Sequence, residues 1–264
     1  MHGLGCIPAI LDGPDDEGGT PDDIASRVNA GQAGLHCCII HPDRAPAVHG
    51  KCFFAKQFRQ VFRIKAKRLD QAAAIAPILR GLCSSHQRMI GHFTDDERVL
   101  QFINSHDLGR LAPLGTSCPD HFLRTKIQPL VLPIGASGDL SNTEKVQAEL
   151  TPAFEQYRKE YAEYYESCKR DTSPAMRDPN PVVILYPGVG MFTFAKNKQT
   201  ARVASEFYIN AINVMRGDEA ITEYTALPRQ EAFDIEYWLL EEAKLQRMPK
   251  EKPLSRKVAL VTGA

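Results

Sequence analysis

The sequence predicts an α/β fold, because apolar runs of strand length alternate with amphipathic stretches of helix length from residue 74 onward. The clearest strand is the β-branched run 181–186, which lies between prolines. The clearest helix is 142–170, which is rich in Glu, Lys, Gln and Tyr and carries apolar side chains along one face. The sequence therefore predicts a folded domain over 74–250 that follows a poorly patterned, disorder-prone segment over 1–73.

The composition of the 264-residue chain argues against several classes of protein. Lys and Arg together number 32, as do Asp and Glu, so no overall charge favours nucleic acid or an anionic membrane surface. No run approaches the ~20 apolar residues of a membrane-spanning helix, and the first residues lack the layout of a secretory signal. Seven cysteines without a Cys-x-x-Cys pair fit reduced thiols better than a disulfide framework. These observations predict a cytoplasmic protein without nucleic-acid or membrane partners.

Two charged stretches occur before residue 74. Residues 12–23 carry acidic side chains among Gly and Pro, with no basic residue, which is typical of a solvated loop. Residues 44–68 carry basic side chains and no acidic one, and their apolar residues recur near helical spacing. This second stretch predicts a basic amphipathic helix. A functional interpretation is that this helix binds nucleic acid or a membrane surface. The structural alternative is that its basic face pairs with the acidic stretch or stays solvated.

The first strand of the domain is expected over 88–93. Thr94 is expected to cap the helix that follows, since the acidic residues 95–97 suit the positive end of a helix. A second strand is expected over 127–134, after a loop rich in Gly and Pro.

The long helix over 142–170 has an aromatic stripe. A stripe of this kind is more often a packing face, within or between subunits, than a platform for a ligand. Its members are Leu150, Phe154, Tyr157, Tyr161, Tyr164 and Tyr165.

The segment after the strand 181–186 predicts a tight turn over Pro187–Gly190 and a second strand. The turn lacks the Gly-x-Gly-x-x-Gly spacing of a phosphate-binding loop, which favours a structural turn. A helix is then expected over 198–216, ending at Gly217, and a final helix over 229–246.

The segment 251–264 predicts a linker and the first strand of a truncated dinucleotide-binding domain. Val258–Val261 is an apolar run, and Thr262 and Gly263 stand where the turn after such a strand meets a cofactor. One strand supplies neither the helix end nor the acidic ribose contact, so this chain alone is not expected to bind NAD. The alternative is a short strand that ends in Gly.

Four segments of the chain are, in order, CPDHFLRTK (118–126), VILYPGVGMF (183–192), FDIEYWLLE (233–241) and VALVTGA (258–264). Together they resemble the bifunctional aldolase/short-chain dehydrogenase family, in which a class II aldolase/adducin-type region is joined to a Rossmann dehydrogenase. The resemblance covers about residues 74–264. It implies an α/β/α layered domain in a homo-oligomeric protein.

The resemblance also implies an activity. The aldolase region would cleave a sugar phosphate of the rhamnulose 1-phosphate type to dihydroxyacetone phosphate and lactaldehyde, and the dehydrogenase would oxidise the aldehyde with NAD. The alternative is a non-catalytic fragment, in which this region supports oligomerisation and places the active sites of a longer protein.

Class II aldolases polarise the ketose carbonyl with zinc held by histidines. The resembled family supplies them from a His-x-His pair and a later His-Gly, and this sequence contains no His-x-His. The candidate ligands are His36, His41 and His49, whose neighbours do not match the family motif. The alternative is that these are loop or surface histidines, so zinc is not expected in this chain alone.

The candidate substrate contacts lie within the first resembled segment. His121, Arg124, Thr125 and Lys126 place an imidazole, a guanidinium, a hydroxyl and an ammonium within six residues, which suits a phosphate or carboxylate. The alternative is structural. Arg124 and Lys126 would then alternate on the exposed face of a strand, while His121 would satisfy a loop carbonyl.

Overall fold

The computed structural model describes residues 53–116, 118 and 121–263, with side chains from residue 64 onward. These residues belong to one compact unit that begins at Phe53. The acidic stretch 12–23 and the candidate zinc ligands His36, His41 and His49 lie outside the described residues.

A four-stranded mixed sheet lies at the centre, with the strand order β1-β4-β3-β2. Strand β1 (Ile90–Thr94) pairs antiparallel with β4 (Gly190–Ala195), which pairs antiparallel with β3 (Val183–Tyr186). Strand β2 (Leu130–Val131) pairs parallel with β3. The α/β class and the hairpin of β3 and β4 are therefore confirmed.

The strand expected over 127–134 is reduced to the two residues of β2. Pro129 and Pro133 flank it, and proline has no N–H for a sheet ladder, so pairing stops on both sides. Lys126 has a φ of 58°, which breaks the extended backbone before the strand begins.

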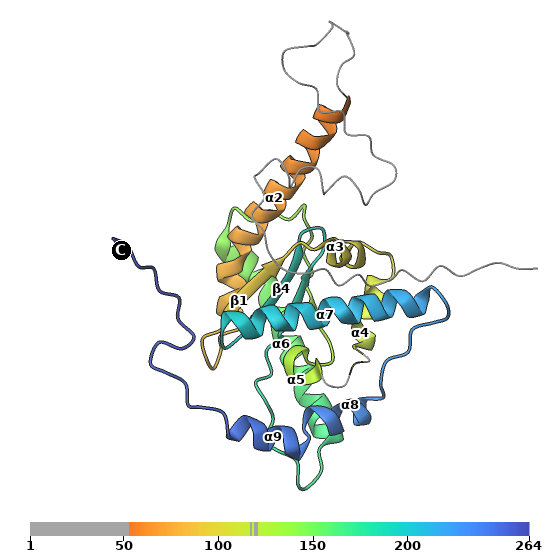
Figure 1. Cartoon of the computed structure of the whole chain (residues 1–264), viewed down its shortest axis with the longest axis vertical. Coiled ribbons are helices and arrows are strands. Elements are labelled where there is room, and N and C mark those ends of the chain that lie inside the picture. The colour runs from red at the N-terminus through yellow and green to blue at the C-terminus, as the bar shows by residue number, and fades with distance from the viewer. Residues whose placement is uncertain (1–52, 117, 119–120, 264) are drawn as a thin grey trace, which may run out of the picture. The chain divides into compact units, whose positions relative to one another are not determined.

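Helices cover both faces of the sheet (Figure 1). Helices α2 (Phe53–Leu82) and α6 (Thr143–Cys168) pack on one face. Helices α3 (Glu97–Ile103), α4 (Leu108–Leu114) and α7 (Lys198–Glu219) pack on the other.

Strand β3 is buried on both faces. Because successive side chains in a strand alternate, Ile184 and Tyr186 enter the core with α2 and α6, whereas Val183 and Leu185 enter the core with α7. This arrangement explains why β3 was the clearest strand in the sequence.

Helix α2 crosses the composition change near residue 74. Its later turns enter the core, where Ile75 and Leu79 are fully buried. The change in patterning therefore falls inside a helix and not between two elements. Of the stretch 44–68, in which a basic amphipathic helix was expected, residues 53–68 form the first part of α2, and residues 44–52 lie outside the described residues. Arg68 pairs with Asp95 of the same unit at 3.3 Å.

Two predicted helix ends are wrong. Asp96, and not Thr94, is the N-cap of α3, because its carboxylate accepts from the Arg98 backbone N–H at 2.9 Å. Thr94 ends β1 instead, and its hydroxyl accepts from the Asp96 N–H. Gly217 lies inside α7, which continues to Glu219.

The final helix, expected to be continuous over 229–246, is broken into α8 (Arg229–Glu236) and α9 (Leu239–Gln246). At the break, Tyr237 is buried and its ring stacks on Phe233 at 4.5 Å between centroids. Helix α9 buries none of its residues.

A third core cluster joins α5 (Phe122–Thr125), the second half of α6, and α8. It takes up the later part of the aromatic stripe of α6, whereas the earlier part packs against the sheet. The expectation that the stripe is a packing face is therefore confirmed within this chain. The cluster contains Phe122, Ile127, Tyr161, Tyr164, Tyr165, Cys168, Ala232, Phe233 and Tyr237.

The apolar run Val258–Val261 forms no strand in the structure, contrary to expectation. Leu260 is 90 % exposed, and no pairing partner for the run occurs among the described residues. Since a strand is held by its neighbours, the run stays irregular here. In the part of the chain that the structure describes, no helix is both long and apolar enough to cross a membrane.

Candidate functional site

The four predicted substrate contacts do not share one surface. Arg124 is exposed on α5, whereas Thr125 and Lys126 are buried. The Thr125 hydroxyl is directed to backbone carbonyls, at 2.8 Å from the Lys126 oxygen and 3.2 Å from the His121 oxygen. The His121 ring stacks on Phe207 of α7 at 4.0 Å. Of the four, Lys126 lines two cavities.

Lys126 is directed inward by its own backbone. It is the C-cap of α5, and its N–H donates to the Phe122 carbonyl while its φ of 58° turns the chain away from the helix. The side chain then enters the third cluster, where the ammonium lies 3.6 Å from the centroid of the Tyr161 ring. The same ammonium donates to the Asp178 carbonyl. The expectation of an exposed strand position is therefore wrong for Lys126.

Burial lowers the pKa of Lys126 to about 8, and the negative charge of Glu236 opposes this shift. Within the described residues, the Asp178 carbonyl is its only hydrogen-bond acceptor. An ammonium has three N–H donors, so two of them are left for a ligand or water.

Glu236 is the carboxylate of the cluster and is 1 % exposed. The Tyr161 hydroxyl donates to one of its oxygens at 2.6 Å, and the Tyr164 hydroxyl donates to the other at 3.2 Å. Because Tyr161 donates to Glu236, the Tyr237 hydroxyl must donate to Tyr161 across their 2.6 Å contact. Burial raises the pKa of Glu236, opposed by the Tyr161 hydrogen bond and by Lys126.

A cavity of about 160 Å³ adjoins this cluster. Its polar lining consists of Lys126, Arg177, Asp178, Asn180 and Glu236. Arg177 donates from Nη2 to the Glu236 backbone carbonyl at 3.1 Å and forms an ion pair with Glu242 at 3.4 Å. Its buried Nε has no hydrogen-bond partner among the described residues. Buried donors of this kind are normally satisfied, so the Nε is a donor that a ligand or a water can still use.

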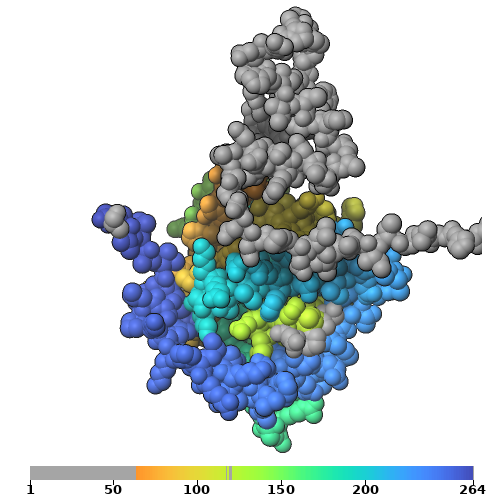
Figure 2. Space-filling model, viewed as in Figure 1, coloured from red at the N-terminus to blue at the C-terminus, as the bar shows by residue number. Residues whose placement is uncertain are grey.

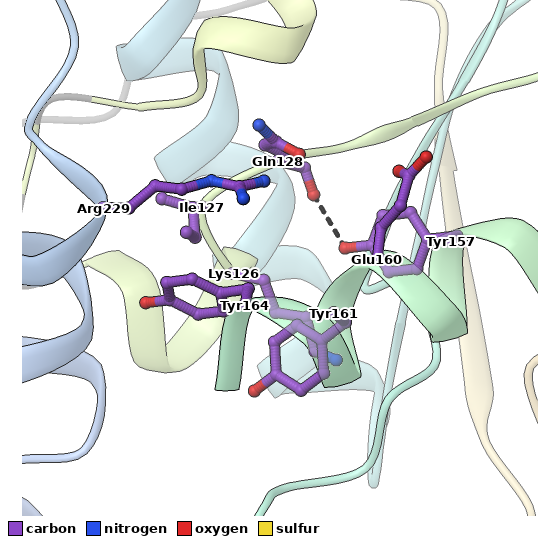
Figure 3. A pocket seen from close by; sticks show the side chains of 8 residues that line it. All are labelled: Lys126, Ile127, Gln128, Tyr157, Glu160, Tyr161, Tyr164 and Arg229. Carbon is purple, nitrogen blue, oxygen red and sulfur yellow. Dashed lines mark hydrogen bonds between the residues drawn. The ribbon is translucent and has the colours of Figure 1, made fainter. Parts of the chain in front are cut away.

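A second recess is also lined by Lys126, together with residues of α6 and Arg229 (Figure 3). Its volume is about 20 Å³, which is the room that one water needs. Figure 3 shows the Tyr157 hydroxyl directed to the Gln128 carbonyl, a hydrogen bond of 2.8 Å, and the Lys126 nitrogen behind the Tyr161 ring. The larger cavity is therefore the candidate ligand site.

The donors on this cavity suit an acceptor-rich small molecule. A guanidinium Nε and an ammonium form strong hydrogen bonds with phosphate, carboxylate or carbonyl oxygens. Asn180 is occupied within the protein, because its amide nitrogen donates to Ser85 and Asp178 and its oxygen accepts from Arg158. Lys126 and Arg177 are thus the side chains that have donors left for a ligand.

No three His, Cys, Asp or Glu side chains gather to hold a metal ion within the described ranges. The residues that the structure describes therefore do not fit a zinc site, and the trio His36, His41 and His49 is not among them. Thr262 and Gly263 lie in the irregular, exposed C-terminal segment. Their predicted contact with NAD stays a prediction.

Glu236 and Arg177 were not predicted from the sequence. Glu236 had a signal, since it lies between Phe233 and Tyr237 on the buried side of α8, and a carboxylate among buried aromatic positions requires partners. Arg177 had none. It lies in the irregular segment between α6 and β3, where no periodicity indicates which side chains turn inward.

A cavity with a largely apolar lining and a few polar side chains is typical of sites that bind small molecules. The profile of the family described as "Aldolase class II, second domain" matches residues 70–245. The chain belongs to this family, and the resemblance to class II aldolases is confirmed at that level.

A named relative is "Uncharacterized oxidoreductase YuxG" of Bacillus subtilis, which is 35 % identical over 197 residues. The match covers 75 % of this chain and 28 % of the relative, so the chain spans less than a third of the protein it resembles. No solved structure matches the chain.

Proposed function

We propose that this chain is the aldolase-type part of a longer protein with two activities, and that its cavity binds the sugar phosphate on which that protein acts. The family match supports an aldolase-like role, and the name and length of the relative support a fused oxidoreductase. A phosphoketose of the rhamnulose 1-phosphate type is the proposed substrate. The observation that carries the proposal is a pair of cations on one 160 Å³ cavity, the buried Lys126 and the half-buried Arg177.

Two cationic donors on one cavity, the Lys126 ammonium and the Arg177 Nε, favour a phosphorylated ligand over a neutral one. The Arg177 guanidinium is fixed by its bonds to Glu236 and Glu242, so its Nε is held in place before a ligand arrives. Because Lys126 is buried, a charge-assisted bond from its ammonium to a ligand oxygen is stronger than the same bond at the surface.

The proposed parts of the cavity have separate tasks. Arg177 holds the phosphate, and Lys126 donates to the carbonyl oxygen of the ligand. Glu236 and the two tyrosine hydroxyls bound to it fix the position of the Lys126 stem. In class II aldolases, zinc supplies the polarisation of the carbonyl. None of the described residues is assigned to a zinc-dependent step.

Arg177→Gln is expected to weaken the binding of dihydroxyacetone phosphate by about 10- to 150-fold, which is the cost of one hydrogen bond to a charged group. Isothermal titration calorimetry on the full chain measures this change. Glutamine keeps an amide for the Glu236 carbonyl, so the fold is expected to persist.

Two further arginine variants serve as controls for the affinity change in Arg177→Gln. Arg202→Gln removes an exposed guanidinium of α7 that pairs with Glu206, and it should leave the affinity unchanged. Arg124→Gln tests the surface of α5 that the sequence predicted. A loss of affinity in Arg124→Gln but not in Arg177→Gln would place the phosphate on that surface and contradict the cavity as its site.

A second candidate function is a non-catalytic scaffold that holds copies of the protein together. Helix α9 buries no residue, and Trp238, Leu239 and Leu240 are each at least half exposed. Figure 2 shows α9 on the outer surface of the chain. Neighbouring exposed apolar side chains of this size favour contact with another protein surface.

Under the scaffold proposal, the chain is expected to form a homo-oligomer, and the double variant Trp238→Glu/Leu239→Glu is expected to lower its mass to that of a monomer. The free-energy cost of burying two carboxylates in an interface exceeds the stabilisation that the two apolar side chains contribute to it. Light scattering after gel filtration measures the mass, and circular dichroism checks that helix content is kept. A wild-type chain that is monomeric at high concentration would rule out this function.

A further inference from the structure

We propose that the outer edge of β1 pairs antiparallel with β1 of a second copy of this chain, so that the sheet continues across a two-fold axis. This contact goes beyond the proposed function and does not depend on the cavity. It is also distinct from the α9 surface of the scaffold candidate. Three features of β1 support it, namely its open backbone edge, the fit of Phe93 to Gly91, and opposite charges at the two ends of the strand.

Strand β1 is an edge of the sheet, because it pairs with β4 alone. The Phe194 N–H of β4 donates to the Val182 carbonyl at 2.9 Å, so the backbone groups of Phe194 are directed to β3 and not to β1. The register partner of Phe194 in β1 is Gly91. Gly91, and Phe93 two residues later, therefore direct their N–H and C=O groups away from β4.

Nothing within β1 blocks pairing at this edge. Natural proteins protect edge strands with Lys, Pro or a bulge, and the sequence IGHFT contains neither Lys nor Pro. The backbone just before the strand is already satisfied, since the Met89 N–H donates to the Ser84 hydroxyl at 3.1 Å and the Met89 carbonyl accepts from Arg80 at 2.8 Å. The open backbone groups of β1 are thus those of Gly91 and Phe93.

An antiparallel pair centred on His92 places Phe93 of each copy opposite Gly91 of the other. Because glycine has no side chain, an aromatic ring on the facing strand can cover it. A groove of about 380 Å³ lies at this place, and Gly91 and Phe93 are among its lining residues. Helix α2 contributes Ala76 and Pro77 to the lining, and these small side chains leave room for a ring from the second copy. The groove and the ring that fills it therefore come from the same strand.

The charges that flank β1 are complementary in the same register. Arg88 precedes the strand and is exposed, whereas Asp95 and Asp96 follow it. The antiparallel pair places Arg88 of each copy opposite Asp96 of the other. A parallel pair would place like charges side by side, so the antiparallel arrangement is favoured.

The two His92 side chains meet at the axis. Burial lowers the pKa of His92, and so do Arg202 and Lys198 of α7, whereas Glu206 of the same helix opposes the shift. Both imidazoles are therefore neutral at pH 7, and the pair brings no like charges together.

The structural alternative is that the C-terminal segment of the same chain covers this edge. Arg256 donates to the Arg88 carbonyl at 3.3 Å, and Val258 lines the groove. However, Val258 is 79 % exposed, and the run Val258–Val261 forms no strand. The segment therefore leaves the backbone groups of β1 open.

Sedimentation equilibrium of the full chain at pH 7 tests the proposal, and we expect a reversible dimer. His92→Glu is expected to weaken the dimer by about 10- to 100-fold, because two carboxylates then meet at the axis. The control His106→Glu adds the same charge at an exposed position between α3 and α4, and it should leave the dimer unchanged. An equimolar mixture of His92→Glu and His92→Lys is expected to restore the dimer, which a mere loss of stability could not do.

The variant His92→Cys tests the register. In an antiparallel pair without mutual hydrogen bonds, opposed Cα atoms lie about 4.5 Å apart, which is within the range of a disulfide. After mild oxidation, peptide mapping by mass spectrometry should find a disulfide that joins the two position-92 peptides. The control His106→Cys should give no such link at position 106.

A wild-type chain that stays monomeric at high concentration would overturn the proposal. A dimer that survives His92→Glu and dissociates in Trp238→Glu/Leu239→Glu would also overturn it and assign the contact to α9. Hydrogen exchange distinguishes the structural alternative. A monomer in which the Gly91 and Phe93 amides are protected would show that the chain covers its own edge.

Discussion

Glu236→Leu is expected to lower the free energy of unfolding by about 2–5 kcal/mol, in part because it removes a buried negative charge that favours the ammonium form of Lys126. The carboxylate also accepts from the Tyr161 and Tyr164 hydroxyls, and both would lose that acceptor inside the protein. Leucine is apolar and of similar size, so the loss comes from the unpaired polar groups and not from a cavity. Urea unfolding of the full chain at pH 7, followed by circular dichroism, measures it.

The double variant Glu236→Leu/Lys126→Met shows how much of the lost stability comes from the uncompensated charge of Lys126. Removing both charges leaves no unpaired ion, so the double variant is expected to be more stable than Glu236→Leu alone. Glu231→Leu is the matched control, since Glu231 is exposed on the same helix and its loss should change stability by about 0.5 kcal/mol or less. Losses that simply add in the double variant would show that Lys126 and Glu236 are not coupled.

The elements that the sequence predicted well are those in which one periodic pattern extends over many residues. Helix α6 was expected over 142–170 and spans Thr143–Cys168, because its aromatic stripe and the Asn142 cap both come from local sequence. The final helix was expected as one element because helical spacing continues through Tyr237 and Trp238. Tertiary contact breaks it, since Tyr237 turns into the third cluster.

The candidate site was predicted only in part, for a similar reason. The segment 118–126 indicated Lys126, but not that the lysine enters the core, because that depends on a positive φ at a residue other than glycine. The partners of Lys126 come from α6, α8 and the loop before β3. Spacing within one segment cannot show which distant segments meet it, so the cavity became visible only in the folded chain.

Gly188→Ala is expected to destabilise the domain by about 2–4 kcal/mol, because it strains both the backbone and the packing of the β3–β4 turn. Tyr186 to Val189 form a turn closed by the Val189 N–H and the Tyr186 carbonyl at 3.0 Å. Pro187 occupies its second position, and Gly188 follows with a φ of 79°, the geometry of a type II turn. A Cβ at position 188 would lie 2.7 Å from the Ala136 Cβ, which is too close for two carbons.

Gly217→Ala is the control that separates this strain from a general effect of alanine. Gly217 lies inside α7, and a Cβ there would meet nothing within 4 Å, so the change should stabilise the chain by about 0.5–1 kcal/mol. Urea unfolding of both variants compares them directly. If Gly188→Ala lowers the free energy of unfolding and Gly217→Ala raises it, the β3–β4 hairpin, which joins the central strands of the sheet, depends on glycine at position 188. A neutral Gly188→Ala would mean that the turn changes its type and Ala136 moves without cost.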